Sequence, residues 1–221
     1  MTFSLLARDP GSGALGGAAA TGSLCVGGWV LRGDSRAGMS ASQGAAPSTM
    51  WGEDVLELLR AGSMAADAVE TITRADSGRD WRQLSALDRS GQSGVFTGAR
   101  NTGWHGSLRG DGIVAAGNML WGPEVLESMK EAFVTASGAF AERFLAALRA
   151  AEAAGGDSRG LQSAALLIVS DDAPPLSLRI DWAEDPLDAL EELHGRTREA
   201  PYASWLPHVP TRKAPERGHD L

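Results

Sequence analysis

Strand-like and helix-like patterns follow one another in blocks along this chain, and the order of these blocks limits the folds open to it. Apolar runs and alternations punctuated by Gly, Pro or Asp predict an opening set of strands. These strands are expected near residues 2–8, 14–21, 24–32 and 36–43. Apolar residues at helical spacing then predict two helices, near 51–61 and 63–75. The chain therefore begins as a meander of strands and continues as a helix pair.

The second half of the chain repeats this block order. Short extended segments are expected at 82–88, 95–97, 113–116, 163–169 and 176–182. Helices are expected at 123–133, 139–154 and 185–193. Strands and helix pairs in separate blocks favour segregated layers over the regular alternation of a parallel α/β sheet. We therefore expect an α+β domain in which two stacked sheets lie between helix pairs.

The composition agrees with one globular domain. The chain has 221 residues, of which 43% are hydrophobic, enough for one substantial core. We place this domain at residues 1–205, because residues 206–221 form a polar tail whose prolines and charges build no core. The net charge of −8 argues against a nucleic-acid partner, since phosphate binding needs a basic surface. A single cysteine, Cys25, excludes an internal disulfide and agrees with a cytoplasmic location.

The stretch from residue 11 to residue 31 contains no charged side chain and admits two other interpretations. Its length suits a membrane span, but its many glycines and hydroxyl residues do not. Gly11-Ser12-Gly13-Ala14-Leu15-Gly16 formally matches the dinucleotide-binding fingerprint, yet that motif must open a helix and a strand pattern follows here. We therefore expect buried strands, no membrane partner and no nucleotide cofactor.

Thr2 directly follows Met1 and opens the first predicted strand. Removal of Met1 frees an α-amine on a residue that also carries a hydroxyl, so one residue supplies both nucleophile and general base. This chemistry defines the N-terminal-nucleophile (Ntn) hydrolases. A retained Met1 blocks the amine and excludes the mechanism. Thr2 is therefore the candidate nucleophile on the condition that Met1 is removed.

Other common catalytic signatures are absent from the sequence. It contains no Gly-x-Ser-x-Gly elbow, no His-Glu-x-x-His pair and no Walker-type lysine. His208 and His219 fall in the tail, which leaves His105 and His194 within the domain. We therefore expect no histidine-based triad, no metal and no organic cofactor.

Several sequence blocks carry a resemblance to a known family. They are Thr2-Phe3-Ser4 with Ala7-Arg8-Asp9, Ser42-Gln43-Gly44, Arg82-Gln83-Leu84, Phe96-Thr97-Gly98, Gly117-Asn118-Met119-Leu120 and, most specific of all, Gly155-Gly156-Asp157-Ser158-Arg159-Gly160-Leu161-Gln162-Ser163-Ala164-Ala165. Over residues 2–195 the chain resembles domain-of-unknown-function family 1028, whose members are assigned the Ntn-hydrolase fold. The resemblance implies a four-layer αββα sandwich and suggests amide cleavage on an unidentified substrate.

Polar residues within these blocks are candidates for the site. Asn118 is the preferred side-chain donor to a tetrahedral oxyanion, and Ser42 and Gln43 lie at a strand end where they offer further polar groups. In the alternative interpretation, Asn118 and Gln43 only satisfy backbone groups of turns.

The most specific block supplies the remaining candidates. Asp157 and Arg159 flank a glycine-rich turn, where a charged pair can hold Thr2 or a substrate carboxylate; the alternative is an exposed ion pair after a helix end. Gln162 and Ser163 follow as substrate-binding candidates. His105 belongs to a separate loop that either lines a pocket or faces solvent.

Two functional hypotheses from different classes remain open. The first is an N-terminal-threonine amidohydrolase acting on a small amide or peptide. The second is a catalytically silent member of the fold that binds a small ligand or assembles as an oligomer. Gly22 favours the second, because a basic residue is expected there to assist the nucleophile, although Arg32, Arg36 or Arg159 can substitute. A homodimer is expected under either hypothesis, with some of the seven tryptophans at its interface.

Overall fold

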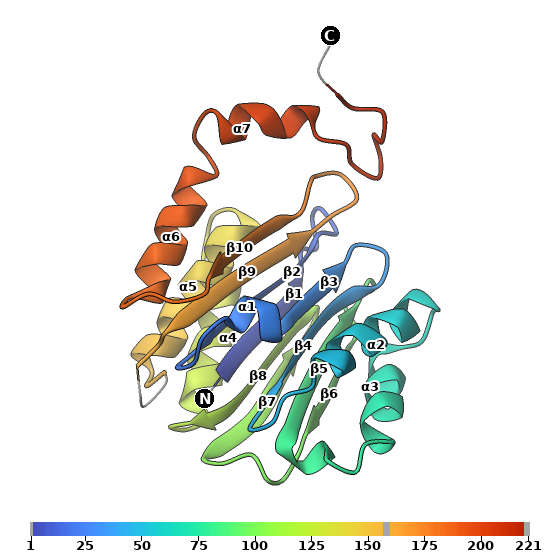
Figure 1. Cartoon of the computed structure of the whole chain (residues 1–221), viewed down its shortest axis with the longest axis vertical. Coiled ribbons are helices and arrows are strands. Elements are labelled where there is room, and N and C mark those ends of the chain that lie inside the picture. Colours follow the sequence, from blue (N-terminus) through green and yellow to red (C-terminus); the bar gives the residue numbers. More distant parts are fainter. Residues whose placement is uncertain (1, 157–159, 219–221) are drawn as a thin grey trace.

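Two antiparallel sheets lie face to face at the centre of the molecule, with helices on their outer sides (Figure 1). The computed structural model describes residues 2–156 and 160–218. Its strands are β1 (Thr2–Arg8), β2 (Leu15–Thr21), β3 (Leu31–Asp34), β4 (Gly38–Gly44), β5 (Arg82–Asp88), β6 (Ser93–Thr97), β7 (Trp104–Gly110), β8 (Ile113–Leu120), β9 (Ser163–Val169) and β10 (Leu176–Ile180). One sheet has six strands in the order β10-β9-β2-β1-β8-β7, and the other has four in the order β3-β4-β5-β6.

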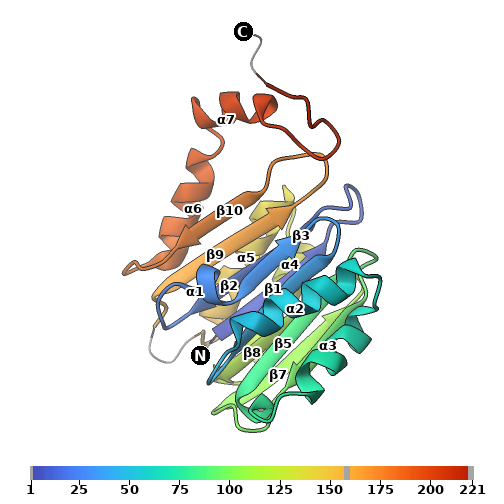
Figure 2. The ribbon, with the colours of Figure 1, turned by 45° about the vertical axis from the view of Figure 1, so that its right-hand side comes forward.

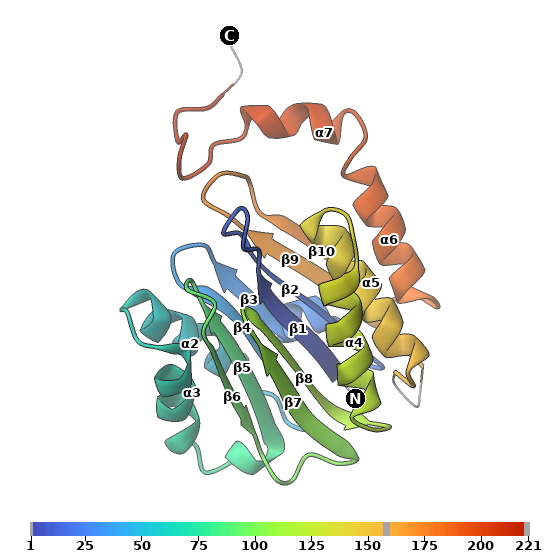
Figure 3. The same cartoon turned by 180° about the vertical axis from the view of Figure 1, so that it is seen from behind.

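Seven α-helices and two short 3-10 helices accompany the sheets in the described residues. They are α1 (Val26–Trp29), α2 (Thr49–Arg60), α3 (Ala65–Arg74), η1 (Arg79–Trp81), α4 (Glu124–Thr135), α5 (Phe140–Ala153), α6 (Pro186–Arg196), α7 (Tyr202–Trp205) and η2 (Leu206–His208). Helices α2 and α3 cover the four-stranded sheet (Figure 2). Helices α4 and α5, with α6 beside them, cover the outer face of the six-stranded sheet (Figure 3). The expected α+β class with two antiparallel sheets is confirmed.

Side-chain alternation along β1 sends apolar groups to both faces of its sheet. Phe3 and Leu5 are fully buried in the core beneath α4 and α5. Leu6 points the other way, into an apolar layer between the two sheets that it shares with Met39. A third core, which includes Trp51, joins α2 and α3 to the four-stranded sheet. Each layer boundary therefore has its own apolar core.

Small residues in β2 allow helix α5 to pack closely on the sheet. A Cβ placed on Gly16 would lie 2.6 Å from Cε2 of Phe144 and 3.0 Å from Cε1 of Phe140. The charge-free stretch 11–31 thus contributes a core strand, as predicted. None of the helices among the described residues combines the length and the apolar character needed to cross a bilayer.

The strand predicted over residues 24–32 is wrong, because a one-turn helix interrupts it. Cys25 adopts left-handed backbone angles (φ 61°), which end the extended course of the chain before α1. The Cys25 N–H donates to the carbonyl of Asp181, and the Val26 N–H donates to Oγ of Ser163. These contacts come from residues far along the chain, so local sequence patterns do not report them. Only β3 remains of the expected strand.

Strand β7, by contrast, lies where no strand was predicted. It forms one edge of the six-stranded sheet, and all seven of its residues are partly or largely exposed. Its Trp104 and Leu108 pack against the core beneath α4 and α5, and small or polar residues occupy the rest of the strand. The stretch Trp104-His105-Gly106-Ser107 therefore gives only a weak strand pattern, and His105 lies on this strand rather than in a loop.

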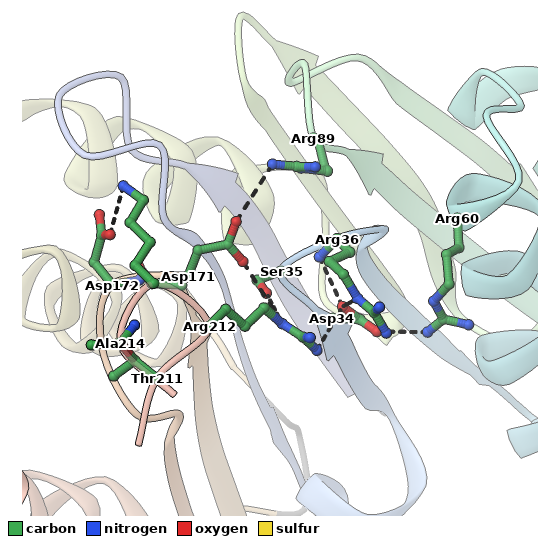
Figure 4. A network of polar contacts seen from close by, with 12 residues as sticks. Asp34, Ser35, Arg36, Arg60, Arg89, Asp171, Asp172, Thr211, Arg212 and Ala214 are labelled. Atoms are coloured by element: carbon green, nitrogen blue, oxygen red, sulfur yellow. Dashed lines mark hydrogen bonds and ion pairs between the residues drawn. The ribbon is translucent and has the colours of Figure 1, made fainter. Parts of the chain in front are cut away.

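The described part of the C-terminal tail contacts the end of the sheets opposite to the N-terminus (Figure 1). Figure 4 shows Arg212 between Asp34 and Asp171, with Nε donating to Oγ of Ser35 at 3.0 Å. Burial acts to raise the pKa of Asp34, but hydrogen bonds from the Arg36 N–H and the Arg60 guanidinium outweigh it, so this pKa is lowered. The carboxylate is thereby kept ionised for its arginine partners.

Candidate active site

Strand register brings four polar residues together at one end of the layer between the sheets. Thr2 pairs with Thr21 on β2 and with Asn118 on β8, and Thr21 pairs with Ser163 on β9. Directly opposite residues in antiparallel strands point to the same face. Leu6 faces the four-stranded sheet, so Thr2, four residues earlier on the same strand, faces it too, as do its partners. The register therefore collects these side chains above the apolar inter-sheet core.

The Thr2 hydroxyl contacts a second hydroxyl. Oγ1 of Thr2 and Oγ1 of Thr21 are 3.1 Å apart, within hydrogen-bond distance. Thr21 is 4% exposed, whereas Thr2 is half-buried and remains accessible. The Thr2 hydroxyl therefore has a fixed neighbour and an open side.

A cavity of about 330 Å³ lies on that open side. Its polar lining residues are Thr2, Thr21, Ser23 and Gln43. The remaining lining residues are small or apolar: Leu24, Val26, Trp29, Val30, Gly44, Ala45, Pro47 and Met119. No ionisable side chain occurs in this described lining. The volume falls at the small end of the range for small-molecule sites, which begins near 300 Å³.

Buried amide side chains support the floor of this region from the opposite sheet. Gln43 on β4 donates from Nε2 to Oε1 of Gln83 on β5 at 2.7 Å and to the carbonyl of Ala116 at 3.2 Å, and lies 3.4 Å from the Thr2 carbonyl oxygen. Gln83 in turn donates to the carbonyl of Gly117 at 3.0 Å. The amide network thus ties the two sheets together beside Thr2.

Two buried amide oxygens in this network have no hydrogen-bond partner among the described residues. They are Oε1 of Gln43 and Oδ1 of Asn118, on side chains that are 1% and 0% exposed. Such orphaned acceptors carry a desolvation cost of about 1–3 kcal/mol each. Both lie near Thr2, where a donor supplied by a ligand or a freed amine would relieve that cost.

Backbone strain points to the same place. Among the described residues, the non-glycine residues with positive φ are Cys25 (61°) and Met119 (58°). Met119 lines the cavity, and Cys25 lies between two lining residues, Leu24 and Val26. Strained residues of this kind cost about 1–3 kcal/mol and cluster at functional sites. Cavity, orphaned acceptors and strain therefore coincide.

The residues predicted from sequence are distributed unevenly around this site. Thr2 and Gln43 line the cavity, and Asn118 is buried beside it on the same sheet face. Ser42 points to the other face of β4, where its hydroxyl donates to the carbonyl of Ser48 before helix α2. His105 lies outside the lining and its Nδ1 is 3.0 Å from the Gly103 carbonyl. Their catalytic or binding roles stay predictions.

Gln162 and Ser163 hold the segment that leads to the cavity wall. Nε2 of Gln162 donates to the Gly22 carbonyl at 3.0 Å, and Oγ of Ser163 donates to the Ser23 carbonyl at 2.7 Å. Both residues therefore act here through the 22–25 segment and α1 rather than through the cavity itself. Asp157 and Arg159 lie outside the described residues.

Neither described arginine proposed as a substitute cation lines the cavity. Arg32 lies 3.3 Å from Glu53 and donates to the Gly28 carbonyl at 2.9 Å. Arg36 pairs with Asp34 at the opposite end of the sheets. In the part of the chain described by the structure, no group of three or more His, Cys, Asp and Glu is placed to hold a metal ion.

Comparison with known proteins shows to which family this chain belongs. The model of the family of unknown function DUF1028 matches residues 2–190. The chain belongs to DUF1028. A crystal structure of the DUF1028 protein SPO2555 from Silicibacter pomeroyi is 54% identical, with a TM-score of 0.96, over 100% of this chain and 96% of that one. A search of curated proteins finds no match. The membership in this family that the sequence blocks indicate is therefore confirmed.

Sequence reasoning missed Thr21, Gln83 and Met119 as members of the site. A signal for Thr21 was present, because pairing the predicted strands 2–8 and 14–21 as a hairpin sets Thr21 opposite Thr2. Gln83 stands on the inward-facing side of its strand, where a polar residue in an otherwise apolar layer is a signal as well. No local pattern indicates the left-handed backbone of Met119.

Proposed function

We propose that this DUF1028 protein is an N-terminal-threonine hydrolase of amide bonds that acts after Met1 is removed. The observation that carries the proposal is the position of Thr2, which opens strand β1 with its hydroxyl beside a cavity of ligand size. We further propose that the helix-covered pair of sheets is the αββα sandwich of the Ntn hydrolases. A nucleophile at the first residue of a central strand agrees with that assignment.

The proposed reaction has two steps. In the first, the neutral α-amine of Thr2 takes the hydroxyl proton while Oγ1 attacks the amide carbonyl carbon. The tetrahedral intermediate then expels the amine product, which receives that proton as the C–N bond breaks. In the second, the α-amine takes a proton from water, and the hydroxide attacks the ester. The acyl–oxygen bond breaks, the proton returns to Oγ1, and the acid is released.

Surrounding groups have supporting roles in this proposal. A free α-amine titrates near pH 8, so a reactive neutral fraction exists at neutral pH. Thr21 orients the nucleophile through its 3.1 Å hydroxyl contact. Asn118 is the proposed oxyanion donor, since among the described residues its Nδ2 makes only a long contact of 3.5 Å to Gln83. Gln43 positions the Thr2 backbone from the opposite sheet.

Hydrolysis by the tag-free protein tests the proposal. Release of amine or ammonia from a panel of small amides is expected for the wild-type chain and for Thr2→Ser, and is expected to disappear in Thr2→Ala. Ser4→Ala is the matched control, because Ser4 lies on the same strand face two residues further in and is fully buried. Equal turnover by wild type and Thr2→Ala would refute the Thr2 mechanism. No turnover of any amide by a chain that begins at Thr2 would favour the silent, ligand-binding alternative.

The expected homodimer is also a proposal at this point. Trp121 and Trp182 are 68% and 64% exposed, a pattern that suits burial against a second copy. Sedimentation equilibrium of the wild type and of Trp182→Ser checks it.

A further inference from the structure

The wall of the Thr2 cavity is divided into a polar and an apolar part. Hydroxyl and amide groups come from Thr2, Thr21, Ser23 and Gln43. The larger apolar part is formed by Leu24, Val26, Trp29, Val30, Pro47 and Met119. A molecule that fits this division has one compact polar group and an apolar body.

Apart from the α-amine that removal of Met1 frees at Thr2, the cavity offers no partner for a charge among the described residues. Its lining contains no Asp, Glu, Lys, Arg or His. The arginines that flank α1 already have partners: Arg32 pairs with Glu53 and Arg179 pairs with Asp181. An ionised ligand group would lose its hydration there without compensation. Away from Thr2, the described part of the lining therefore selects against carboxylates and ammonium groups.

The apolar wall extends to the surface of the molecule. Val26 and Val30 are 1% and 4% exposed and belong to the inter-sheet core, so they are fixed in place. Leu24 and Trp29, which also line the cavity, are 51% and 52% exposed. Large apolar side chains in this position gain burial only when something apolar covers them. An apolar ligand tail leaving the cavity meets both residues.

From these observations we propose that the cavity takes an uncharged amide whose acyl part is apolar, of the size of a short fatty or arylalkanoic amide. This inference rests on the proposed function, which places the amide group at Thr2 and has it cleaved there. The apolar acyl part then lies along α1 and Pro47. A volume of about 330 Å³ suits one such small molecule rather than an extended peptide.

Binding to the Thr2→Ala chain tests the ligand class separately from catalysis. The probes are butanamide, hexanamide and octanamide, with 6-aminohexanamide and the amide of a dicarboxylic acid as charged counterparts, measured by calorimetry. Affinity is expected to rise about fourfold for each added methylene until the cavity is filled. The charged counterparts are expected to bind more than tenfold more weakly.

Matched tryptophan variants locate the binding. Trp29→Ala and Leu24→Ser are expected to weaken octanamide binding about tenfold or more, because both residues line the cavity. Trp121→Ala removes a tryptophan that is more exposed than Trp29 and does not line the cavity, so it is expected to leave affinity unchanged. No binding of the neutral series, equal or tighter binding of charged amides, or equal effects of Trp29→Ala and Trp121→Ala would each overturn the inference.

The two proposals fail in different ways. If Thr2→Ala binds hexanamide as expected but the chain with a free Thr2 does not cleave it, the hydrolase proposal fails and the ligand class stands. If the wild type cleaves only charged amides, the hydrolase proposal stands and the ligand class is wrong.

Discussion

Replacing Gln83 with Leu tests whether the buried amide network is a structural support of the Thr2 region. Gln83 is fully buried, and leucine has a similar size but no polar atoms. The change removes the acceptor of the 2.7 Å bond from Gln43, and it removes the donations from Gln83 to Oγ1 of Thr97 and to the carbonyls of Gly106 and Gly117. Gln43 keeps its bond to the Ala116 carbonyl, but each buried group that loses its last partner costs about 1–3 kcal/mol. We expect the free energy of unfolding to fall by about 3 kcal/mol.

Urea unfolding at neutral pH, followed by tryptophan fluorescence, measures this loss. With an m-value of about 3 kcal/mol/M, the midpoint should fall by about 1 M without a change in slope. Ser85→Ala is the matched control on the same strand face: it is 1% exposed and its Oγ has no partner among the described residues. That variant should be neutral or slightly more stable. A Gln83→Leu midpoint within 0.3 M of the Ser85→Ala midpoint, about 1 kcal/mol at that m-value, would refute the network as described.

Three further predictions concern the scaffold. Gly98→Ala should destabilise the protein by about 3 kcal/mol, because a Cβ there meets the backbone carbonyls of Arg79 and Asp80. Gly195→Ala should stabilise it by about 0.5 kcal/mol, because a Cβ at this position in helix α6 has no atom within 4 Å. Thermal unfolding compares the two variants. Burial, and after it the charge of Arg198, lower the pKa of His194, while Glu142 opposes them. The stability that the neutral His194 ring contributes is therefore complete above about pH 6.5 and is lost as the pH falls through the lowered pKa. His194→Gln should therefore flatten the fall in urea midpoint between pH 7.5 and pH 5, and an unchanged fall would contradict this. Arg212→Ala should speed amide exchange at residues 211–214 but change global stability by less than about 1 kcal/mol, since the Arg212 side chain is 46% exposed and its ion pairs are long, at 3.7 and 3.8 Å.

Elements with strong local patterns were predictable from the sequence. The expected strand 2–8 coincides with β1, and the expected helix 139–154 matches α5 within a residue at each end. Helix α5 repeats apolar residues at helical spacing because one of its faces is buried, whereas β1 is a largely apolar run because both of its faces are buried. The region around Cys25 was not predictable, since its left-handed turn is stabilised by contacts with Asp181 and Ser163.

The residues of the candidate site were likewise predictable only in part. Thr2 was identified because its chemistry depends on its place in the chain, and Gln43 because it ends a predicted strand in a specific block. The partnership of Gln43 with Gln83 and the cavity wall of α1 arise only when two sheets stack, a relation between residues that sequence spacing does not encode.

The most direct test of the Thr2 mechanism is the intact mass and N-terminal sequence of the chain produced without a tag. The proposed mechanism predicts that the mature chain begins at Thr2, with its amine free beside the hydroxyl. Quantitative retention of Met1 in active protein would contradict it.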